Sequence, residues 1–563
     1  MGRIPTALAH RTGPDAGPHR KEPILKQARL KELQADILVV GGGLGGVAAA
    51  LAALRAGRRV VLTEEYDWIG GQLTSQAVPP DESSWVEQFG VTASYRQLRE
   101  GIREYYRRHY PLTEAARNTR ELNPGGGHVS RLCHEPRVAV AVMESMLAPH
   151  IGSGRLRLLQ PYRPVAADVD GDRVEAVTLA HRDTGEQLVV SAPYVLDATE
   201  TGELLPLTGT EYVTGFESAR VTGEPSAPDE AQPDNMQAVS VCFAIDHVEG
   251  DHTIDKPADY DFWRDFRTDF WGGNLLGFRA PNPRTLEAAE RTFEPNPDDD
   301  PLAVVGDQRR GGGDMNLWTF RRIAARRNFT PGAYASDVTL VNWPMIDYFL
   351  APVIDNPDAA VHLERARELS RSVMYWLQTE APRADGGTGW PGLRLRGDVT
   401  GSADGLAQAP YHRESRRIKA EYTVVEQDLS AAVRGDKGAV SYHDSVGIGM
   451  YRIDLHPSTG GDNYIDVASC PFEIPLGALL PVRVDNLLPA GKNLGTTHIT
   501  NGCYRLHPVE WNIGEAAGAL AAFAFERGTA PRAVAADPAL LAAFQDRLTA
   551  QGFELRWPDI AAY

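Results

Sequence analysis

Cysteine is scarce in this 563-residue sequence, which contains only Cys133, Cys242, Cys470 and Cys503. These four lie far apart without a C-x-x-C pair, which argues against a disulfide framework and a thiolate zinc site. No run of about 18 apolar residues occurs, so no membrane-spanning helix is predicted. Basic residues are also in deficit, with 57 Lys and Arg against 75 Asp and Glu. The resulting net charge of -18 argues against nucleic acid or an anionic membrane surface as a partner. We expect a cytoplasmic protein.

The N-terminal 34 residues mix Pro, Gly, Arg, Lys and His and lack the apolar core of a signal peptide. We therefore expect residues 1–34 to form a flexible extension. The length of the chain predicts two or more lobes, because a single hydrophobic core rarely grows this large.

The segment "DILVVGGGLGGVAAALAALRAGRRVVLTEE" (residues 36–65) has the order strand, glycine turn, helix, strand, acid. The glycines of Gly41-x-Gly43-x-x-Gly46, with Leu44 and Gly45 between them, allow a tight turn and close approach of a pyrophosphate to the backbone. An acid at the end of the second strand accepts hydrogen bonds from a ribose. Glu64 is the first candidate for this acid and Glu65 the alternative. The segment predicts a dinucleotide site.

Three later segments extend this pattern. They are "YDWIGGQLTS" with Gly70, Gly71, Gln72 and Leu73; "YVLDATETGELL" with Ala198, Thr199 and Gly202; and "LLPAGKN…HPVEWNIGEAAG" with Gly491, Asn493, Val509 and Gly514. With the "RESRRI" stretch, they resemble the FAD-dependent oxidoreductases that have a glutathione-reductase-like FAD domain. The match departs at Glu200 and Thr201, where that family usually has glycine and aspartate. No second strand–G-x-G-x-x-G–helix unit occurs, so an intrinsic NAD(P)H domain is not expected.

The resemblance implies an α/β fold: a Rossmann-like FAD-binding domain built from discontinuous segments, plus a mixed α+β substrate domain. We expect the FAD domain at 35–215 and 455–530, with a helical insertion at about 81–127. The substrate domain is expected at 216–454 and a helical tail at 531–563. The resemblance also implies a small β-meander with Val165 near the adenine. Residues 70–77 contain no His, Cys or Tyr, so FAD is expected to be non-covalent.

Candidate catalytic residues cluster in "THITNGCYRLHP", which we expect to be a loop crossing the flavin ring. Histidine accepts a proton and arginine binds a carboxylate. The loop resembles the "HG-x-NRLGG" segment of fumarate reductase and succinate dehydrogenase flavoproteins, although its His–Arg spacing is seven residues rather than four. Purely structural roles are the alternative. The candidates are His498, Tyr504, Arg505 and His507, with Asn501 beside them.

Two further clusters are less specific. Arg413 and Arg416 would face the same way on a helix and clamp an anion, or they and Arg417 would pair with Glu414 or Glu421. The pairs His443–Asp444 and Asp454–His456 lack the spacing of a metal site, so no metal is predicted.

These observations predict an FAD-dependent dehydrogenase or oxidase that transfers a hydride between a small organic substrate and flavin. Electrons would then pass to oxygen or a separate carrier. The substrate is expected to carry a carboxylate, which arginine binds, or an aromatic or sugar-like ring. The ring is expected because six of the ten tryptophans lie between Trp263 and Trp390 and offer aromatic faces. The alternatives are a reductase of an activated double bond, a non-redox lyase-like flavoprotein, and an RNA-modifying flavoprotein. The last is opposed by the acidic charge. The sequence does not specify an oligomeric state.

Overall fold

The computed structural model describes residues 31–304, 316–558 and 560. Its centre is a five-stranded parallel sheet in the order β23-β8-β2-β3-β4. The strands come from distant parts of the chain: β2 (Ile37–Val40), β3 (Val60–Thr63), β4 (Leu156–Leu159), β8 (Tyr194–Asp197) and β23 (Leu487–Pro489). Strands β2, β3 and β8 are buried throughout, as parallel strands covered on both faces require. The predicted α/β fold with a discontinuous nucleotide-binding sheet is confirmed.

Two long helices pack against each other beside this sheet, and glycine makes their close approach possible. Helix α1 (Leu44–Arg55) follows the glycine turn, and α14 (His507–Arg527) leads away from the last strand. A Cβ atom on Gly514 of α14 would lie 2.0 Å from the Gly45 carbonyl oxygen of α1. The small residues of the C-terminal motif therefore serve helix packing.

The predicted β-meander is also confirmed. Strands β5 (Tyr162–Asp170), β6 (Arg173–His181) and β7 (Gln187–Ser191) are antiparallel neighbours. The structure differs from the prediction at the start of the chain, where Lys31–Gln34 form β1, parallel to β7. The open edge of β7 supplies backbone hydrogen-bonding groups that a polar segment can use without an apolar pattern. The rest of the predicted extension, residues 1–30, lies outside the described residues.

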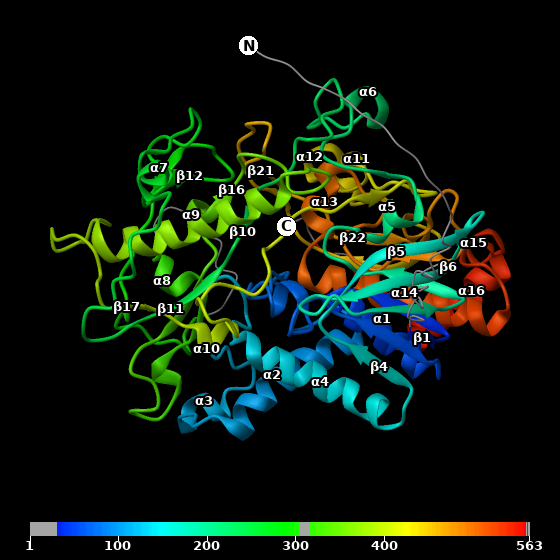
Figure 1. Cartoon of the computed structure of the whole chain (residues 1–563), viewed down its shortest axis with the longest axis horizontal. Coiled ribbons are helices and arrows are strands. Elements are labelled where there is room, and N and C mark those ends of the chain that lie inside the picture. The colour runs from blue at the N-terminus through cyan, green and yellow to red at the C-terminus, as the bar shows by residue number, and fades with distance from the viewer. Residues whose placement is uncertain (1–30, 305–315, 559, 561–563) are drawn as a thin grey trace, which may run out of the picture.

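A second lobe, seen at the left of Figure 1, combines an antiparallel sheet with a long helix. The sheet has the order β14-β15-β11-β17, and α9 (Ala359–Thr379) crosses the lobe. The strands of this lobe are β10 (Val239–Ser240), β11 (Phe243–His247), β12 (Arg279–Pro281), β13 (Ala288–Glu290), β14 (Arg322–Ala324), β15 (Val338–Val341), β16 (Asp347–Tyr348) and β17 (Leu393–Leu395). The mixed α+β character expected here is confirmed.

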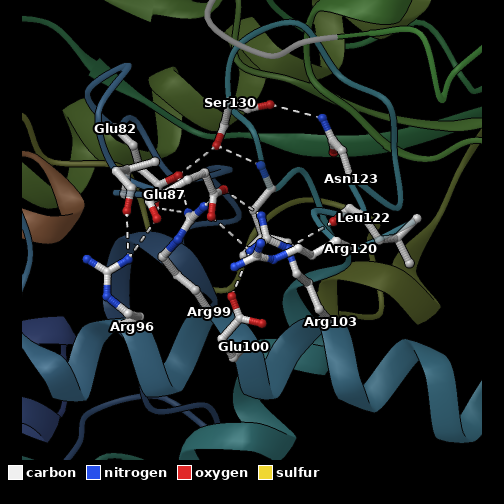
Figure 2. A network of polar contacts seen from close by, with 12 residues as sticks. Glu82, Glu87, Arg96, Arg99, Glu100, Arg103, Arg120, Leu122, Asn123 and Ser130 are labelled. Carbon is white, nitrogen blue, oxygen red and sulfur yellow. Dashed lines mark hydrogen bonds and ion pairs between the residues drawn. The ribbon is translucent and has the colours of Figure 1, made fainter. Parts of the chain in front are cut away.

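The predicted helical insertion contains α2 (Ala93–His109) and the short α3 (Glu114–Asn118). Figure 2 shows arginines of α2 pointing toward Glu82 and Glu87 in the preceding loop. Arg99 Nη1 donates to Glu82 at 2.6 Å, and Arg103 Nη2 donates to Glu87 at 2.6 Å. Because all four side chains are nearly buried, removing one partner would leave an uncompensated charge. This network fixes the loop that begins at Asp81.

The remaining helices include α4 (Pro136–Gly152), which begins at a proline and packs on α2. The segment expected to be a loop at 498–504 is instead α13 (His498–Tyr504), because the Thr497 hydroxyl caps its first turn by accepting from Thr500 N. The C-terminal tail contains α15 (Pro531–Ala536) and α16 (Pro538–Ala550). Among the described residues, no helix combines the length and apolar character needed to span a membrane.

Candidate active site

A cavity of about 340 Å³ opens at the carboxyl ends of the parallel strands, and we call it the nucleotide cavity. Its wall contains the glycine turn, the end of β3, the start of β5 and the segment after β8, and the second lobe closes it. Of the residues predicted to bind cofactor, the wall includes Gly41, Gly43, Glu64, Glu65, Ala198 and Thr199. This is the edge at which open α/β sheets bind nucleotides.

The positions of the glycine turn need glycine for different structural reasons. Gly41 has φ +101°, and a Cβ atom there would lie 2.2 Å from the Ala198 carbonyl oxygen. A Cβ atom on Gly45 would lie 1.8 Å from the Ala490 carbonyl oxygen. Gly43 is different, because its nearest neighbours are the carboxylate ends of Glu200 at 2.9 Å and Glu510 at 3.5 Å. Gly41 and Gly45 therefore serve the fold, whereas Gly43 keeps the wall of the cavity open.

Three acids at this cavity have raised pKa values. Burial raises the pKa of Glu64 to about 8, although the carboxylate accepts hydrogen bonds from Tyr66 N at 2.8 Å and Gly42 N at 3.0 Å. Burial also raises the pKa of Glu65, against the opposing effect of Arg163 and Arg182. The pKa of Glu203 rises to about 7 through burial and the nearby charges of Glu65 and Asp197.

A buried polar cluster lies beside Gly43 and was not predicted. Lys492 forms an ion pair with Glu200 and lies 3.8 Å from Glu510. Glu510 accepts hydrogen bonds from Gly45 N at 3.3 Å and from the Gln72 side chain. Burial opposes both charges of the Lys492–Glu200 pair, but mutual attraction raises the pKa of Lys492 and lowers that of Glu200. Little in the sequence indicates this cluster, because Glu200 is marked only by its departure from the family pattern.

A second cavity, of about 320 Å³, lies between the second lobe and the segment 451–466, and we call it the substrate cavity. Apolar side chains make up much of its wall, with charged groups among them, as in many small-molecule sites. Among the residues on its wall are Asp81, Arg284, Arg291, Phe320, Arg321, Trp343, Asp454, His456, Tyr464 and Asp466.

His456 occupies the wall of the substrate cavity in a fixed orientation. Its Nδ1 lies 2.6 Å from the carboxylate of Asp347, which is fully buried at the start of β16. Burial alone would raise the pKa of Asp347, but Arg413 and His456 lower it to about 2. Arg413 Nη2 donates to the other carboxylate oxygen at 2.9 Å. Because Asp347 occupies Nδ1, Nε2 remains for a ligand, as in sites where a carboxylate orients a histidine base.

Arg505 and His507 contact wall residues of the substrate cavity without lining either cavity themselves. The carbonyl oxygen of Arg505 accepts from Gln72 Nε2 at 2.9 Å, and its guanidinium donates to Tyr411 Oη at 2.7 Å and the Asp454 carbonyl at 2.9 Å. His507 Nδ1 accepts from Asp81 N at 3.0 Å, and burial lowers the pKa of His507 to about 4. Both residues hold wall segments of the substrate cavity.

The other two predicted catalytic residues lie elsewhere. His498 is buried, with Nδ1 2.9 Å from Glu414 and its ring against Phe216. Tyr504 is buried and donates to the Glu473 carbonyl at 2.6 Å. Neither lines a described cavity.

The arginines of the "RESRRI" segment do not form one clamp, because residues 412–416 are not helical. Arg413 binds Asp347, Arg416 binds Asp355, and Arg417 binds Glu414 and Glu217. The His443 side chain is exposed, 4.0 Å from Asp444. No group of three or more metal-type ligands gathers within the described ranges.

The remaining residues predicted to bind cofactor do not line the nucleotide cavity. Asn493 Nδ2 donates to the Asp197 carbonyl at 3.0 Å, and Gly71 and Gly491 lie beside Glu200 and Glu510, respectively. Val165 follows Tyr162, Arg163 and Pro164, which do line the cavity. The others outside the wall are Leu44, Gly45, Gly46, Gly70, Gln72, Leu73, Gly202, Val509 and Gly514.

Comparison with known proteins agrees with this geometry. Residues 36–548 match the sequence model of the FAD dependent oxidoreductase family, so the chain belongs to this family. A stretch of 89 residues is 36% identical to N,N-dimethylglycine/sarcosine dehydrogenase of Chromohalobacter salexigens. That stretch is 16% of this chain and 10% of the relative, so the chain matches about a tenth of the relative's length.

Two solved structures are similar over part of the chain. L-proline dehydrogenase from P. horikoshii is 14% identical, with 34% of this chain and 26% of that chain covered and a TM-score of 0.17. Mycobacterium smegmatis Sdh1 in complex with UQ1 is 13% identical, with 30% and 34% covered and a TM-score of 0.22.

Proposed function

We propose that the protein is an FAD-dependent dehydrogenase or oxidase that oxidises a small organic molecule in the substrate cavity, with electrons passing to oxygen or a separate carrier. The observation that carries this proposal is His456, which Asp347 orients at 2.6 Å on the wall of that cavity. A histidine held in this way is suited to accept the proton that leaves a substrate as it is oxidised.

The residues of the nucleotide cavity fit the cofactor of the family. Gly43 has no side chain where the wall faces the cavity, and the N-terminal N–H groups of α1 attract phosphate. Glu64 and Glu65 lie where a ribose needs acceptors. The side-chain carboxylate of Glu200 lies next to Gly43, but only the end of this flexible side chain is close to the glycine. Gly41, Gly43, Glu64, Glu65, Ala198 and Thr199 would hold FAD, and Lys492 would supply positive charge.

When bound, FAD supplies the two-electron acceptor for a hydride from a substrate C–H bond. The protein has to handle the proton on the neighbouring oxygen or nitrogen of the substrate. His456 Nε2 would take this proton, and Asp347 would stabilise the resulting imidazolium while keeping its own charge, since Arg413 and His456 hold its pKa at about 2. Arg505 and His507 would position the wall through Asp454 and Asp81.

Anaerobic absorption spectroscopy tests the proposal. Purified FAD-loaded protein is mixed with panels of amines, alcohols and acids, and the oxidised flavin band is monitored. We expect at least one panel member to bleach the band and oxygen or an artificial acceptor to restore it. If chemically reduced protein is instead reoxidised by activated alkenes alone, the protein is a reductase. If no compound changes the flavin redox state while a substrate is still consumed, the flavin has a non-redox role.

The two acids that follow β3 should differ in their contribution to FAD binding. Glu64 is the more enclosed and already faces the glycine turn through Gly42 N. We expect Glu64→Ala to weaken FAD binding by about 1.5–3 kcal/mol, the range for hydrogen bonds to a charged group. Glu65→Ala should cost less, because Glu65 is more exposed. Isothermal titration of FAD into both apo-variants provides the measurement, and equal losses or a larger loss for Glu65→Ala would contradict the assignment.

FAD affinity should also depend on pH through Glu64. The pKa of this residue in the FAD-free protein is about 8, and hydroxyl donors favour the charged carboxylate. Binding below this pKa therefore requires proton release, so affinity should rise with pH by up to about tenfold per unit, then level off above pH 8. Glu64→Gln, which cannot ionise, should bind more weakly at pH 8 and lose this slope. A wild-type affinity independent of pH between 6 and 8 would contradict the prediction.

A further inference from the structure

The arginines on the wall of the substrate cavity differ in how their charge is compensated. Arg284 lies 3.7 Å from the Asp466 carboxylate, and Arg321 lies 3.9 Å from that of Asp81. For Arg291, no carboxylate among the described residues lies within ion-pair distance. Its guanidinium donates there only to the carbonyl oxygens of Ala280 and Pro281, both at 3.4 Å. Burial lowers the pKa of Arg291, as expected for a cation largely removed from water without a counter-charge.

The acids on the same wall already interact with other cations. Asp466 forms an ion pair with Arg452, and Asp454 lies 3.5 Å from Arg505. On the described part of the wall, Arg291 is therefore the cation that has no carboxylate partner. A half-buried cation of this kind is stabilised by an anionic partner, and a guanidinium matches the two oxygens of a carboxylate.

Three more donors in the wall lack an acceptor within the described chain. They are the Trp343 indole N–H, the Tyr464 hydroxyl and Arg321 Nη1. Two are nearly fully buried side chains, Trp343 at 1% and Tyr464 at 4% exposed. The wall therefore has donors without a hydrogen-bond partner in the described chain, which a ligand with oxygen acceptors would satisfy.

The arrangement also links this charge to His456. The Tyr464 ring centroid is 5.3 Å from that of His456, and the charge of Arg291 opposes the rise in the pKa of Tyr464 that burial causes. Tyr464 is thus close to both the arginine and the histidine on this wall. Phe320 and Trp343 provide aromatic surface in the same cavity.

We infer that the substrate cavity binds a small organic carboxylate with an apolar or aromatic body, and that Arg291 is the residue that recognises its carboxylate. The body would contact Phe320 and Trp343, and the bond to be oxidised would lie toward His456. This inference names the substrate class of the proposed oxidoreductase and so rests on the proposed function. A volume of about 320 Å³ suits a ring with a short acidic chain.

Equilibrium binding tests the inference without turnover. FAD-loaded protein is titrated by calorimetry with benzoate, phenylacetate and indole-3-acetate, and with the neutral amide of each acid. The variants are Arg291→Gln, the charge-conserving Arg291→Lys, and Arg279→Gln as the matched control. Arg279 belongs to the same β12–β13 hairpin, but its side chain is exposed and pairs only loosely with Glu290, at 3.6 Å. FAD content and melting temperature are recorded for each protein.

We expect at least one acid to bind at least tenfold more tightly than its amide. Arg291→Gln should remove this preference, Arg291→Lys should retain part of it, and Arg279→Gln should retain it fully. Amides that bind as well as acids, a panel in which no acid binds, or equal losses in Arg291→Gln and Arg279→Gln would overturn the inference. These results are independent of flavin reduction: carboxylate binding by a protein whose flavin never bleaches would leave the inference standing and contradict the proposed function.

Discussion

A Gly43→Val protein should fold and purify without its yellow colour. The backbone at Gly43 has φ −60°, which valine adopts readily, and the nearest atoms to an added Cβ belong to the side-chain carboxylates of Glu200 and Glu510 rather than to backbone. The valine side chain would lie on the wall of the nucleotide cavity, where we propose that the backbone approaches the pyrophosphate. We expect FAD affinity to fall by at least about 100-fold, or roughly 2.7 kcal/mol. The flavin-to-protein absorbance ratio and the melting temperature together provide the measurement.

Two other glycines serve as controls for this prediction. Gly45→Val should prevent folding, since its Cβ atom would lie 1.8 Å from the Ala490 backbone oxygen. Gly152→Val should retain FAD, because Gly152 ends α4 with no neighbouring atom within 4 Å of an added Cβ. Normal flavin content in the Gly43→Val protein would show that the cofactor does not approach this part of the turn.

Replacement of His456 should suppress flavin reduction while leaving the cofactor in place. Its side chain lines the substrate cavity and is absent from the wall of the nucleotide cavity, so its loss should not release FAD. Without this proton acceptor, we expect substrate to reduce the flavin of the His456→Ala protein about 10²- to 10⁴-fold more slowly than the flavin of the wild type. This is the range for general acid–base catalysis. Anaerobic stopped-flow absorption, with a substrate identified by bleaching, provides the rate.

The comparison variants distinguish this role from a general effect of losing a histidine. His443→Ala should reduce at the wild-type rate, because the His443 side chain is 86% exposed. His498→Ala and His507→Ala test residues that the sequence favoured, and we now expect smaller kinetic effects from both. Asp347→Asn would disturb the buried Arg413 pair and therefore tests folding more than chemistry. A His456→Ala rate within twofold of wild type would remove this residue from the mechanism.

The sequence indicated a segment close to the substrate cavity but none of the side chains on the wall of that cavity. Within the predicted cluster at 498–507, Arg505 contacts Gln72, and His507 contacts Asp81, which lines the substrate cavity. Periodicity and residue type could not show that His498 and Tyr504 point into packed protein. Their hydrogen-bond partners, Glu414 and the Glu473 carbonyl, come from other segments.

By itself, the sequence determined the nucleotide-binding sheet, because the glycine turn, its flanking strand and helix, and the acid Glu64 are contained in 30 consecutive residues, 36–65. The physics of that unit is local: strand and helix periodicity, the backbone freedom of glycine, and a short turn. Only the tertiary structure brought Asp347 to His456, 109 positions apart, and Lys492 to Glu200, 292 positions apart. Among the described residues, it alone left Arg291 half-buried with no carboxylate at ion-pair distance. Such pairings depend on how the second lobe packs onto the sheet, and no short-range pattern in the chain records which distant charges that packing brings together or separates.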